Sequence, residues 1–344
     1  MNLGTFFSLV KNRTALLWIL TGCLIGPPMA AAAAAPIKVG IIGLDAHALP
    51  WTKIIHDRQA ARPVADMRIA AAVPAFSPDI PFSKDHIEKN TAAMRELGVE
   101  ICDGIEAMLP KVDAVMVLSI DGRPHLRQAR PVFAARKPVF IDKPVASSLA
   151  EALVLFREAR ASGTPCFSSS SLRYSPGIAG MTNHAAVGRV LGCDAYGNNR
   201  SILPGHPDLF YYGIHGSEML FTIMGSGCQT VSRVQGETAD LVTGVWTDGR
   251  VGTFRGILNG STAFGATVFG EKGIAPAGKF EGYEPLLVEI ARFFRTGQPP
   301  VSAEETIEIY AFMEAADESL RQGGLPVSIQ SVLEKARRQA EGGS

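Results

Sequence analysis

Residues 137–144 read Lys-Pro-Val-Phe-Ile-Asp-Lys-Pro, a short apolar run that ends abruptly on an acid, a lysine and a proline. Such a run is typical of a strand buried on both faces of a parallel sheet. In open α/β sheets, the residues just beyond the carboxyl end of a strand face the ligand crevice. Lys143 is therefore the first candidate catalytic residue. The alternative is an ordinary solvated lysine at a strand end, which is the commoner case for an isolated lysine.

Strand-like and helix-like segments alternate on both sides of this run, from residue 37 to residue 174. The clearest helix signal is the capping box of Ser148 and Glu151, with Gly163 as the stop. Such alternation predicts a doubly wound parallel sheet. The other expected strands are 37–44, 67–73, 99–102, 113–120 and 164–169, and the expected helices are 51–61, 86–97, a segment ending at 135, and 148–161.

Beyond about residue 176 the pattern changes to alternating strands joined by tight turns such as Asp248-Gly249. The expected strands are 187–198, 239–246, 251–258 and 262–270. Helices are expected at 283–295 and 303–322, and the second of them opens with a capping box of Ser302 and Glu305. The predicted fold class is α/β, with an N-terminal Rossmann-type doubly wound parallel sheet and a C-terminal α+β domain with a largely antiparallel sheet. We place the dinucleotide-binding domain at 36–174 and the substrate-binding and oligomerisation domain at 175–344.

The N-terminus has the pattern of an export signal. Lys11 and Arg13 precede an apolar run and an alanine-rich stretch, and no acid comes before them. This predicts a signal peptide or lipoprotein leader over 1–35, with Cys23 as the residue that would carry the lipid. An uncleaved span over 14–35 is the third alternative. The expected location is the periplasm, or the cell envelope by a lipid anchor.

Composition sets limits on the partners. The chain of 344 residues is 47% hydrophobic and carries 33 basic and 33 acidic residues, so nothing in its charge balance asks for nucleic acid. The cysteines after the leader lack the close spacing of zinc sites, and we expect buried thiols and no metal: Cys102, Cys166, Cys193 and Cys228. His206, Asp208 and His215 are the only histidine cluster, and they show no recognised ligand spacing.

The turn after the first strand resembles a damaged dinucleotide fingerprint. Residues 43–48 read Gly-Leu-Asp-Ala-His-Ala, so Asp45 stands where the fingerprint has its second glycine, and Ala48 is a tolerated third residue. An aspartate at this point puts negative charge where phosphates should lie. The second strand should end on an acid for the ribose hydroxyls, but Pro74 follows it and Asp79 is the nearest carboxylate.

Two histidines follow glycine-containing loops. His215 lies in an aromatic, glycine-bounded segment at 210–220 that runs into a helix, where an imidazole can take a proton from a substrate hydroxyl. His125 follows the strand at 113–120 and could contact a ligand from its carboxyl end. For both, a structural role at a helix start is the competing interpretation.

Together these motifs resemble the Gfo/Idh/MocA oxidoreductases, named for glucose-fructose oxidoreductase and inositol dehydrogenase. The resemblance covers nearly all of the chain after the leader. It rests on residues 39–48, on Asp113-Ala114-Val115 with the later His125, on Asp142-Lys143-Pro144 in place of the family's Glu-Lys-Pro, on Gly213-Ile214-His215, and on a closing segment at 316–327.

The resemblance implies roles for single residues. Lys143 would lie beside the nicotinamide and the substrate, and His215 would be the general acid/base. Tyr211, the third implied catalytic residue, stands where the family usually has an aspartate four residues before that histidine. Arg173, Tyr212 and Glu218 would meet the substrate. The implied cofactor-binding residues are Gly43, Leu44, Asp45, His47, Ala48, Ser119, His125, Asp142 and Lys143.

Three functions remain open from sequence. The first is a nicotinamide-dependent oxidoreductase that uses NAD or NADP to oxidise a hydroxyl of a sugar, sugar acid or cyclitol. The second is a redox-neutral hydrolase or lyase on a glycoside, with a captive nucleotide. The third is a cofactor-free carbohydrate-binding protein, prompted by Asp45, by the missing acid after the second strand and by Tyr211. A homo-oligomer is expected, since an open sheet commonly buries one face against a partner.

Overall fold

The computed structural model describes residues 35–342, and residues 36–342 of this range form one compact unit. The expected leader, Cys23 and the alternative span over 14–35 lie outside the described residues except for residue 35. Within 35–342, no helix is both long and apolar enough to cross a bilayer. All four cysteines of this region are buried free thiols, as predicted.

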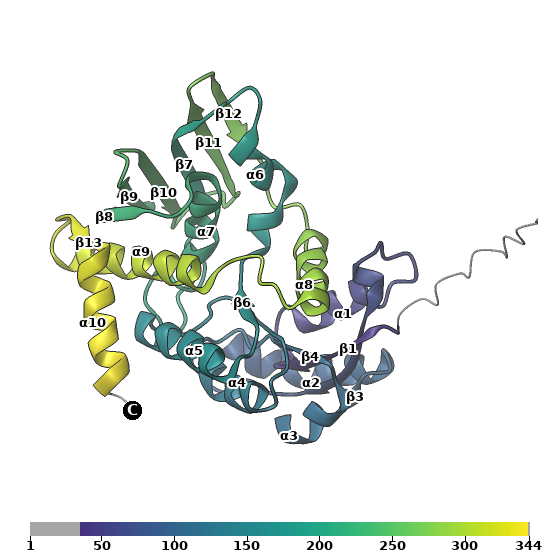
Figure 1. The fold of residues 1–344 in the computed structure, drawn as a ribbon. Helices are drawn as coiled ribbons and strands as arrows, with labels where there is room; N and C mark the ends of the chain where they lie inside the picture. The colour runs from purple at the N-terminus through teal and green to yellow at the C-terminus, as the bar shows by residue number, and fades with distance from the viewer. Residues whose placement is uncertain (1–34, 343–344) are drawn as a thin grey trace, which may run out of the picture. The chain divides into compact units, whose positions relative to one another are not determined.

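Strand order identifies the first sheet as a doubly wound parallel sheet (Figure 1). Its six strands run β3-β2-β1-β4-β5-β6, and every neighbouring pair is parallel, which confirms the predicted fold class. The order reverses between β1 and β4, so the ligand crevice is expected at the carboxyl ends of these two strands. The strands are β1 (Ile37–Ile42), β2 (Met67–Val73), β3 (Glu100–Ile101), β4 (Ala114–Val117), β5 (Val139–Ile141) and β6 (Cys166–Ser168).

Helices of this half follow the predicted alternation, with shifted ends. The first begins at Ala48 and stops at Ile55, earlier than expected, because Asp57 accepts a hydrogen bond from the amide of Gln59 and turns the chain. The second begins five residues early at Pro81, a residue that suits a first helical turn. The helices are α1 (Ala48–Ile55), α2 (Pro81–Glu96), α3 (Ile105–Met108), α4 (His125–Ala134) and α5 (Leu149–Ser162).

The serine cap of each predicted capping box forms. The Ser148 hydroxyl accepts a hydrogen bond from the Glu151 amide, and Gly163 ends α5 with a φ of 69°. In the same way, Ser302 caps α9 (Ala303–Arg321) by accepting from the Glu305 amide. These local signals fixed the starts of two long helices correctly.

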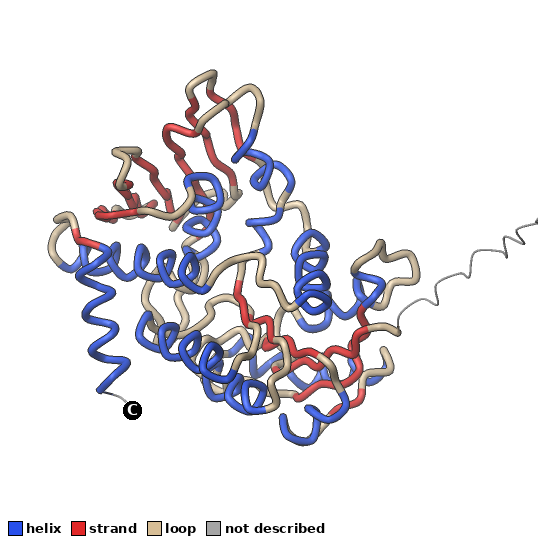
Figure 2. Tube along the Cα trace, viewed as in Figure 1, coloured by secondary structure: helices blue, strands red, loops and turns tan. Residues whose placement is uncertain are grey.

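A second sheet is built from the C-terminal half, and Figure 2 shows its strands as a group separate from the first sheet. Its order is β12-β11-β7-β10-β9-β8-β13, and all its pairs are antiparallel except β7 with β10. The strands are β7 (Val190–Asn198), β8 (Cys228–Gln235), β9 (Ala239–Trp246), β10 (Val251–Ile257), β11 (Gly265–Gly270), β12 (Ile274–Ala277) and β13 (Val327–Ser328). The sequence analysis did not predict β8 or β12, whereas β13 begins at the end of the closing segment expected at 316–327.

Helices cover one face of this sheet. Helices α7 and α9 pack against β7, β8 and β10, whereas the other face presents large apolar side chains to solvent. We call this surface the open sheet face; its members are Leu191, Tyr196, Val234, Leu241, Val245 and Val251, each 38–66% exposed. The remaining helices are α6 (Pro176–Ala179), α7 (Gly213–Met224), α8 (Glu284–Thr296) and α10 (Ile329–Gly342), and short 3-10 turns lie at η1 (Val64–Asp66), η2 (Leu109–Lys111), η3 (Ser171–Tyr174) and η4 (Gly180–Asn183).

Packing crosses the boundary predicted at 174/175. Helix α8 belongs to the C-terminal half of the chain, yet it lies beside α1 in Figure 1 and shares one apolar core with the first sheet. In that core, Phe293 of α8 meets Phe167 of β6 edge to face, with ring centroids 4.8 Å apart. The two-domain division therefore stays a prediction, with α8 tied to the N-terminal sheet.

Candidate functional site

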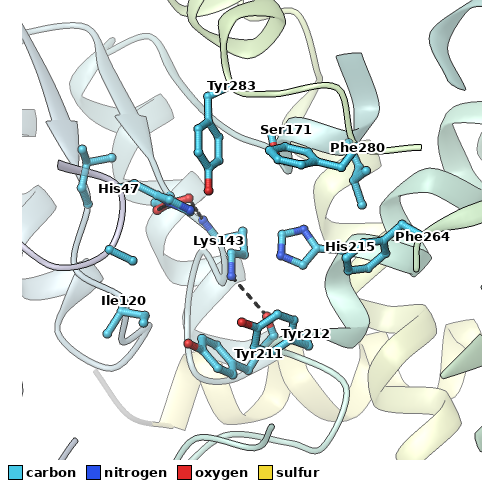
Figure 3. A pocket seen from close by; sticks show the side chains of 14 residues that line it. His47, Ile120, Lys143, Ser171, Tyr211, Tyr212, His215, Phe264, Phe280 and Tyr283 are labelled. Atoms are coloured by element: carbon cyan, nitrogen blue, oxygen red, sulfur yellow. Dashed lines mark hydrogen bonds and ion pairs between the residues drawn. The ribbon is translucent and has the colours of Figure 1, made fainter. Parts of the chain in front are cut away.

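A cavity of about 240 Å³ opens at the carboxyl ends of the first sheet (Figure 3). Its lining comes from the turn after β1, the ends of β4 and β5, the start of α7 and the segment before α8. Lys143 and His215 both line it, as the sequence predicted, together with His47, Asp142, Tyr211 and Tyr212. Its aromatic walls include Phe264, Phe280 and Tyr283, which the sequence analysis did not single out.

Lys143 is a buried lysine directly beyond β5. Its side chain is directed into the cavity, where Nζ donates a 3.4 Å hydrogen bond to the Tyr211 carbonyl and lies 4.8 Å and 5.4 Å from the ring centroids of Tyr211 and Tyr212. Burial lowers the pKa of Lys143, and the charge of Asp142 opposes that shift. The cavity thus holds an ammonium group that touches aromatic faces and one carbonyl.

Asp142 is paired with His47 rather than turned toward a nucleotide. His47 Nδ1 lies 2.5 Å from Asp142 Oδ2, and the His47 ring stacks on Trp51 with centroids 4.9 Å apart. Burial opposes ionisation of Asp142, but the charges of His47 and Lys143 and its hydrogen bonds hold its pKa below the usual value. The sequence had assigned both residues to the cofactor, and the 95-residue separation hid their contact.

His215 stands in the first turn of α7, and its Nδ1 is 2.6 Å from the Ser170 hydroxyl. Burial, followed by the charges of Lys143 and His47, lowers its pKa well below the usual value, so the ring is held in its neutral form. Ser170 therefore orients His215 where relatives were expected to use an aspartate. The sequence offered only a run of four serines, 168–171, as a signal for it.

The contacts of Tyr211 differ from its predicted catalytic place beside His215. The ring near His215 is that of Tyr212, 5.9 Å between centroids, whereas Tyr211 lies over Lys143. Burial raises the pKa of Tyr211, so its phenol stays protonated. Tyr211 thus contributes a carbonyl and a ring face to Lys143.

Arg173 and Glu218, expected to meet the substrate, form a buried support behind the cavity and do not line it. Glu218 accepts hydrogen bonds from the Ser170 amide at 2.8 Å and from Arg173 Nε at 2.8 Å, and also from the Ser169 hydroxyl. A guanidinium nitrogen of Arg173 also pairs with Glu305 at 2.7 Å. The charges of Arg173, Glu218 and Glu305 neutralise one another in this buried place. Because Glu218 also accepts from the Ser170 amide, these contacts fix the backbone that presents Ser170 to His215.

Gly43 keeps the geometry of a fingerprint glycine. Its φ is +90°, and a Cβ there would stand 2.5 Å from the Ser119 amide nitrogen, so no other residue fits. Ser119 itself bonds to Gln128. His125 has no exposed surface, and its ring nitrogens lie 2.9 Å from the Ser119 carbonyl oxygen and 3.3 Å from that of Val145. It therefore supports the loop after β4 instead of reaching the cavity.

Asp45 is at odds with a dinucleotide. Its carboxylate is buried at the turn and accepts hydrogen bonds from Ser83 and from the Ile120 amide. Hollows lie around Lys143 and after β2. In this conformation the Asp45 carboxylate stands at the turn where the fingerprint brings the backbone to a diphosphate. Among residues 35–342, no group of three His, Cys, Asp or Glu side chains is placed to hold a metal ion.

Comparisons with known proteins identify the first half of the fold. Residues 37–169 match the model of a family described as an oxidoreductase family with an NAD-binding Rossmann fold. No curated protein sequence matches the chain.

Solved structures match over most of the chain. A probable dehydrogenase from Thermotoga maritima is 19% identical, with a TM-score of 0.70 over 86% of this chain and 100% of that one. Scyllo-inositol dehydrogenase from Lactobacillus casei, solved with NAD(H) and scyllo-inositol, is 16% identical, with a TM-score of 0.69 over 86% and 99%. Myo-inositol dehydrogenase from the same organism, solved with NAD(H) and myo-inositol, is 17% identical, with 0.69 over 85% and 96%. Identities this low show the fold alone.

The neutral state of His215 is testable. We expect its imidazole to remain unprotonated from pH 8 to pH 5.5, because it is buried beside a cation. In Lys143→Met the pKa of His215 should rise but stay below that of a free histidine, since burial is the larger cause. Ring resonances followed by NMR measure both, with the exposed Lys89→Met as the control. A His215 that titrates near pH 6.5 in the unmodified protein would contradict this account.

Proposed function

We propose that the protein oxidises a hydroxyl of a sugar, sugar acid or cyclitol, and the premise is that residues 37–169 match the model of the Gfo/Idh/MocA oxidoreductase family with its NAD-binding Rossmann fold. The observation that carries the proposal is that Lys143 and His215 line one cavity at the carboxyl edge of the first sheet. NAD, when bound, supplies the acceptor for the hydride.

His215 is suited to take the hydroxyl proton. When its Nδ1–H donates to Ser170, Nε2 is left as a free acceptor, and the lowered pKa keeps that nitrogen unprotonated before reaction. Because the ring is buried, solvent does not readily protonate Nε2. We therefore expect this nitrogen to receive its proton from the bound hydroxyl as the hydride leaves the adjacent carbon.

Lys143 is suited to stabilise the oxygen on which negative charge develops. Its ammonium group donates one long hydrogen bond, to the Tyr211 carbonyl, so its other two protons can face a substrate oxygen. Asp142 lies beside Lys143 and opposes the neutralising effect of burial, which helps keep the lysine charged. Lys143 thus stabilises the charge on the oxygen, and His215 accepts its proton.

The walls of the cavity support this substrate class. Tyr212, Phe264, Phe280 and Tyr283 offer apolar faces to the C–H bonds of a ring, while the polar groups of Lys143 and His215 meet its hydroxyls. The cavity volume of about 240 Å³ suits one small ring rather than an oligosaccharide. That two structural neighbours were solved with inositols makes cyclitols the first compounds to assay. The glycoside-cleaving and the cofactor-free alternatives gain no support from these comparisons.

Replacement of the two central residues tests the assignment. In Lys143→Met and His215→Gln, turnover of an identified substrate should fall by roughly 10²–10⁴-fold while the fold is retained, because each removes one partner of the reacting hydroxyl. NADH formation at 340 nm, with myo-inositol, scyllo-inositol and simple sugars, is the measurement, and Lys89→Met is the control. Full activity in either variant would remove that residue from the mechanism.

We also propose a homo-oligomer formed through the open sheet face. Support comes from the six large apolar side chains gathered on one side of the second sheet, a clustering that marks interaction surfaces. Val245→Glu with Leu241→Glu should convert the oligomer to monomers, because two charges would be buried in the interface. Size-exclusion chromatography with light scattering measures this, and Ile202→Glu, exposed elsewhere, is the matched control. If the unmodified protein is monomeric at every concentration measured, the proposal is contradicted.

We propose further that the chain is exported by its first 35 residues, to the periplasm or to a lipid anchor at the envelope. Only the sequence supports this, through its two basic residues, apolar run and alanine-rich end. Fractionation of cells that express the full chain should recover the protein outside the cytoplasm, with processing after residue 35 or before Cys23. Recovery of the unprocessed chain in the cytoplasm would overturn it.

A further inference from the structure

We infer that Asp45 is a latch across the centre of the dinucleotide crevice, and that NAD binds only after its carboxylate has released Ser83 and the Ile120 amide. The inference rests on the proposed function, because it concerns how the same site admits its cofactor. It makes Asp45 the residue that sets dinucleotide affinity in this chain.

The latch ties three segments together. Asp45 is 1% exposed; its Oδ1 accepts a 2.5 Å hydrogen bond from the hydroxyl of Ser83 on α2, and its Oδ2 accepts one of 2.9 Å from the Ile120 amide after β4. The amide group of Asn90 donates to the carbonyls of Leu44 and Asp45, at 2.7 Å and 3.0 Å. The turn after β1 is therefore fastened both to α2 and to the loop after β4.

The position of Asp45 is the one that a diphosphate needs. In a fingerprint turn, the second glycine allows the backbone to approach the diphosphate, and here a carboxylate stands at that point. Two further acids, Asp121 and Asp142, are close enough to act on its charge. A diphosphate that approached this turn would meet like charge, which is unfavourable in a buried place.

An apolar plug completes the closure. Ile80, Ile120 and Leu203 form a small buried cluster from three separate segments, and Ala46 and Tyr211 pack against it. On one side lies the cavity of Lys143. On the other lies a hollow of about 590 Å³, bordered by 74–79 after β2 and by residues of 121–128 after β4.

A dinucleotide has to reach both hollows. In this fold the ribose end lies at the carboxyl end of β2 and the diphosphate lies at the turn after β1. The two hollows are thus in the places of the two ends of the cofactor, and the latch and plug separate them where its middle belongs. Burial raises the pKa of Asp45, so the closed state holds the carboxylate at an electrostatic cost that opening would relieve.

Binding of NAD to the full chain tests the latch. By isothermal titration calorimetry, Asp45→Gly should bind NAD at least tenfold more tightly than the unmodified protein, because it removes the carboxylate and restores the fingerprint glycine. Asp57→Gly makes the same chemical change at an exposed position beyond α1 and should leave affinity unchanged. Circular dichroism confirms that each variant is folded.

A second variant guards against misfolding of the first. Ser83→Ala leaves the turn intact and removes one hydroxyl from the latch, so it should tighten NAD binding several-fold. If the unmodified protein binds NAD tightly and neither variant improves on it, the latch is wrong while the proposed cofactor stands. If none of the three proteins binds NAD, the proposed oxidoreductase function is overturned, and the latch with it.

Discussion

The site depends on a charged pair placed at the end of a buried strand. Lys143 and Asp142 follow β5 directly, so the sheet carries both into an interior where an isolated charge would be strongly disfavoured. Asp142 resolves this by contacting His47, by accepting from the Lys143 amide at 2.8 Å, and by lying close to the lysine charge. The next residue but one, Val145, donates its amide to the Tyr310 hydroxyl at 2.6 Å, which anchors the strand end to α9. The position of the ammonium group is therefore set from both halves of the chain.

Local sequence signals predicted much of the fold. Some signals depend only on residues close by in the sequence, and these formed as expected. They are the serine caps at Ser148 and Ser302, the apolar runs of the first sheet and the glycine at position 43. The parallel pairing of β7 with β10 and the return of α8 to the first sheet could not be read in this way. They are decided by which apolar faces find each other, and such contacts leave no pattern in either segment alone.

The same division holds within the site. Lys143 and His215 could be found because each follows a recognisable strand or loop. Ser170 as the partner of His215, and His47 as the partner of Asp142, are contacts across 45 and 95 residues. Arg173 and Glu218 were singled out for their charge, yet charge alone does not distinguish a ligand from a buried pair that satisfies itself. Their contacts with Ser169, Ser170 and Glu305 show the latter.

The first two glycine positions of the fingerprint, of which one is kept and one is replaced, respond to different physical demands. Gly43 is required by the protein itself, because a side chain there would collide with the Ser119 backbone whether or not a nucleotide is present. The second glycine is required only by a ligand that must approach the backbone, and at that position the chain carries Asp45. A fingerprint can therefore keep the glycine that folding demands and lose the one that binding demands. In this chain Asp45 replaces that glycine, and its contacts with Ser83 and the Ile120 amide hold the crevice shut. These contacts must break before a dinucleotide binds, so their loss reduces the net free energy of binding.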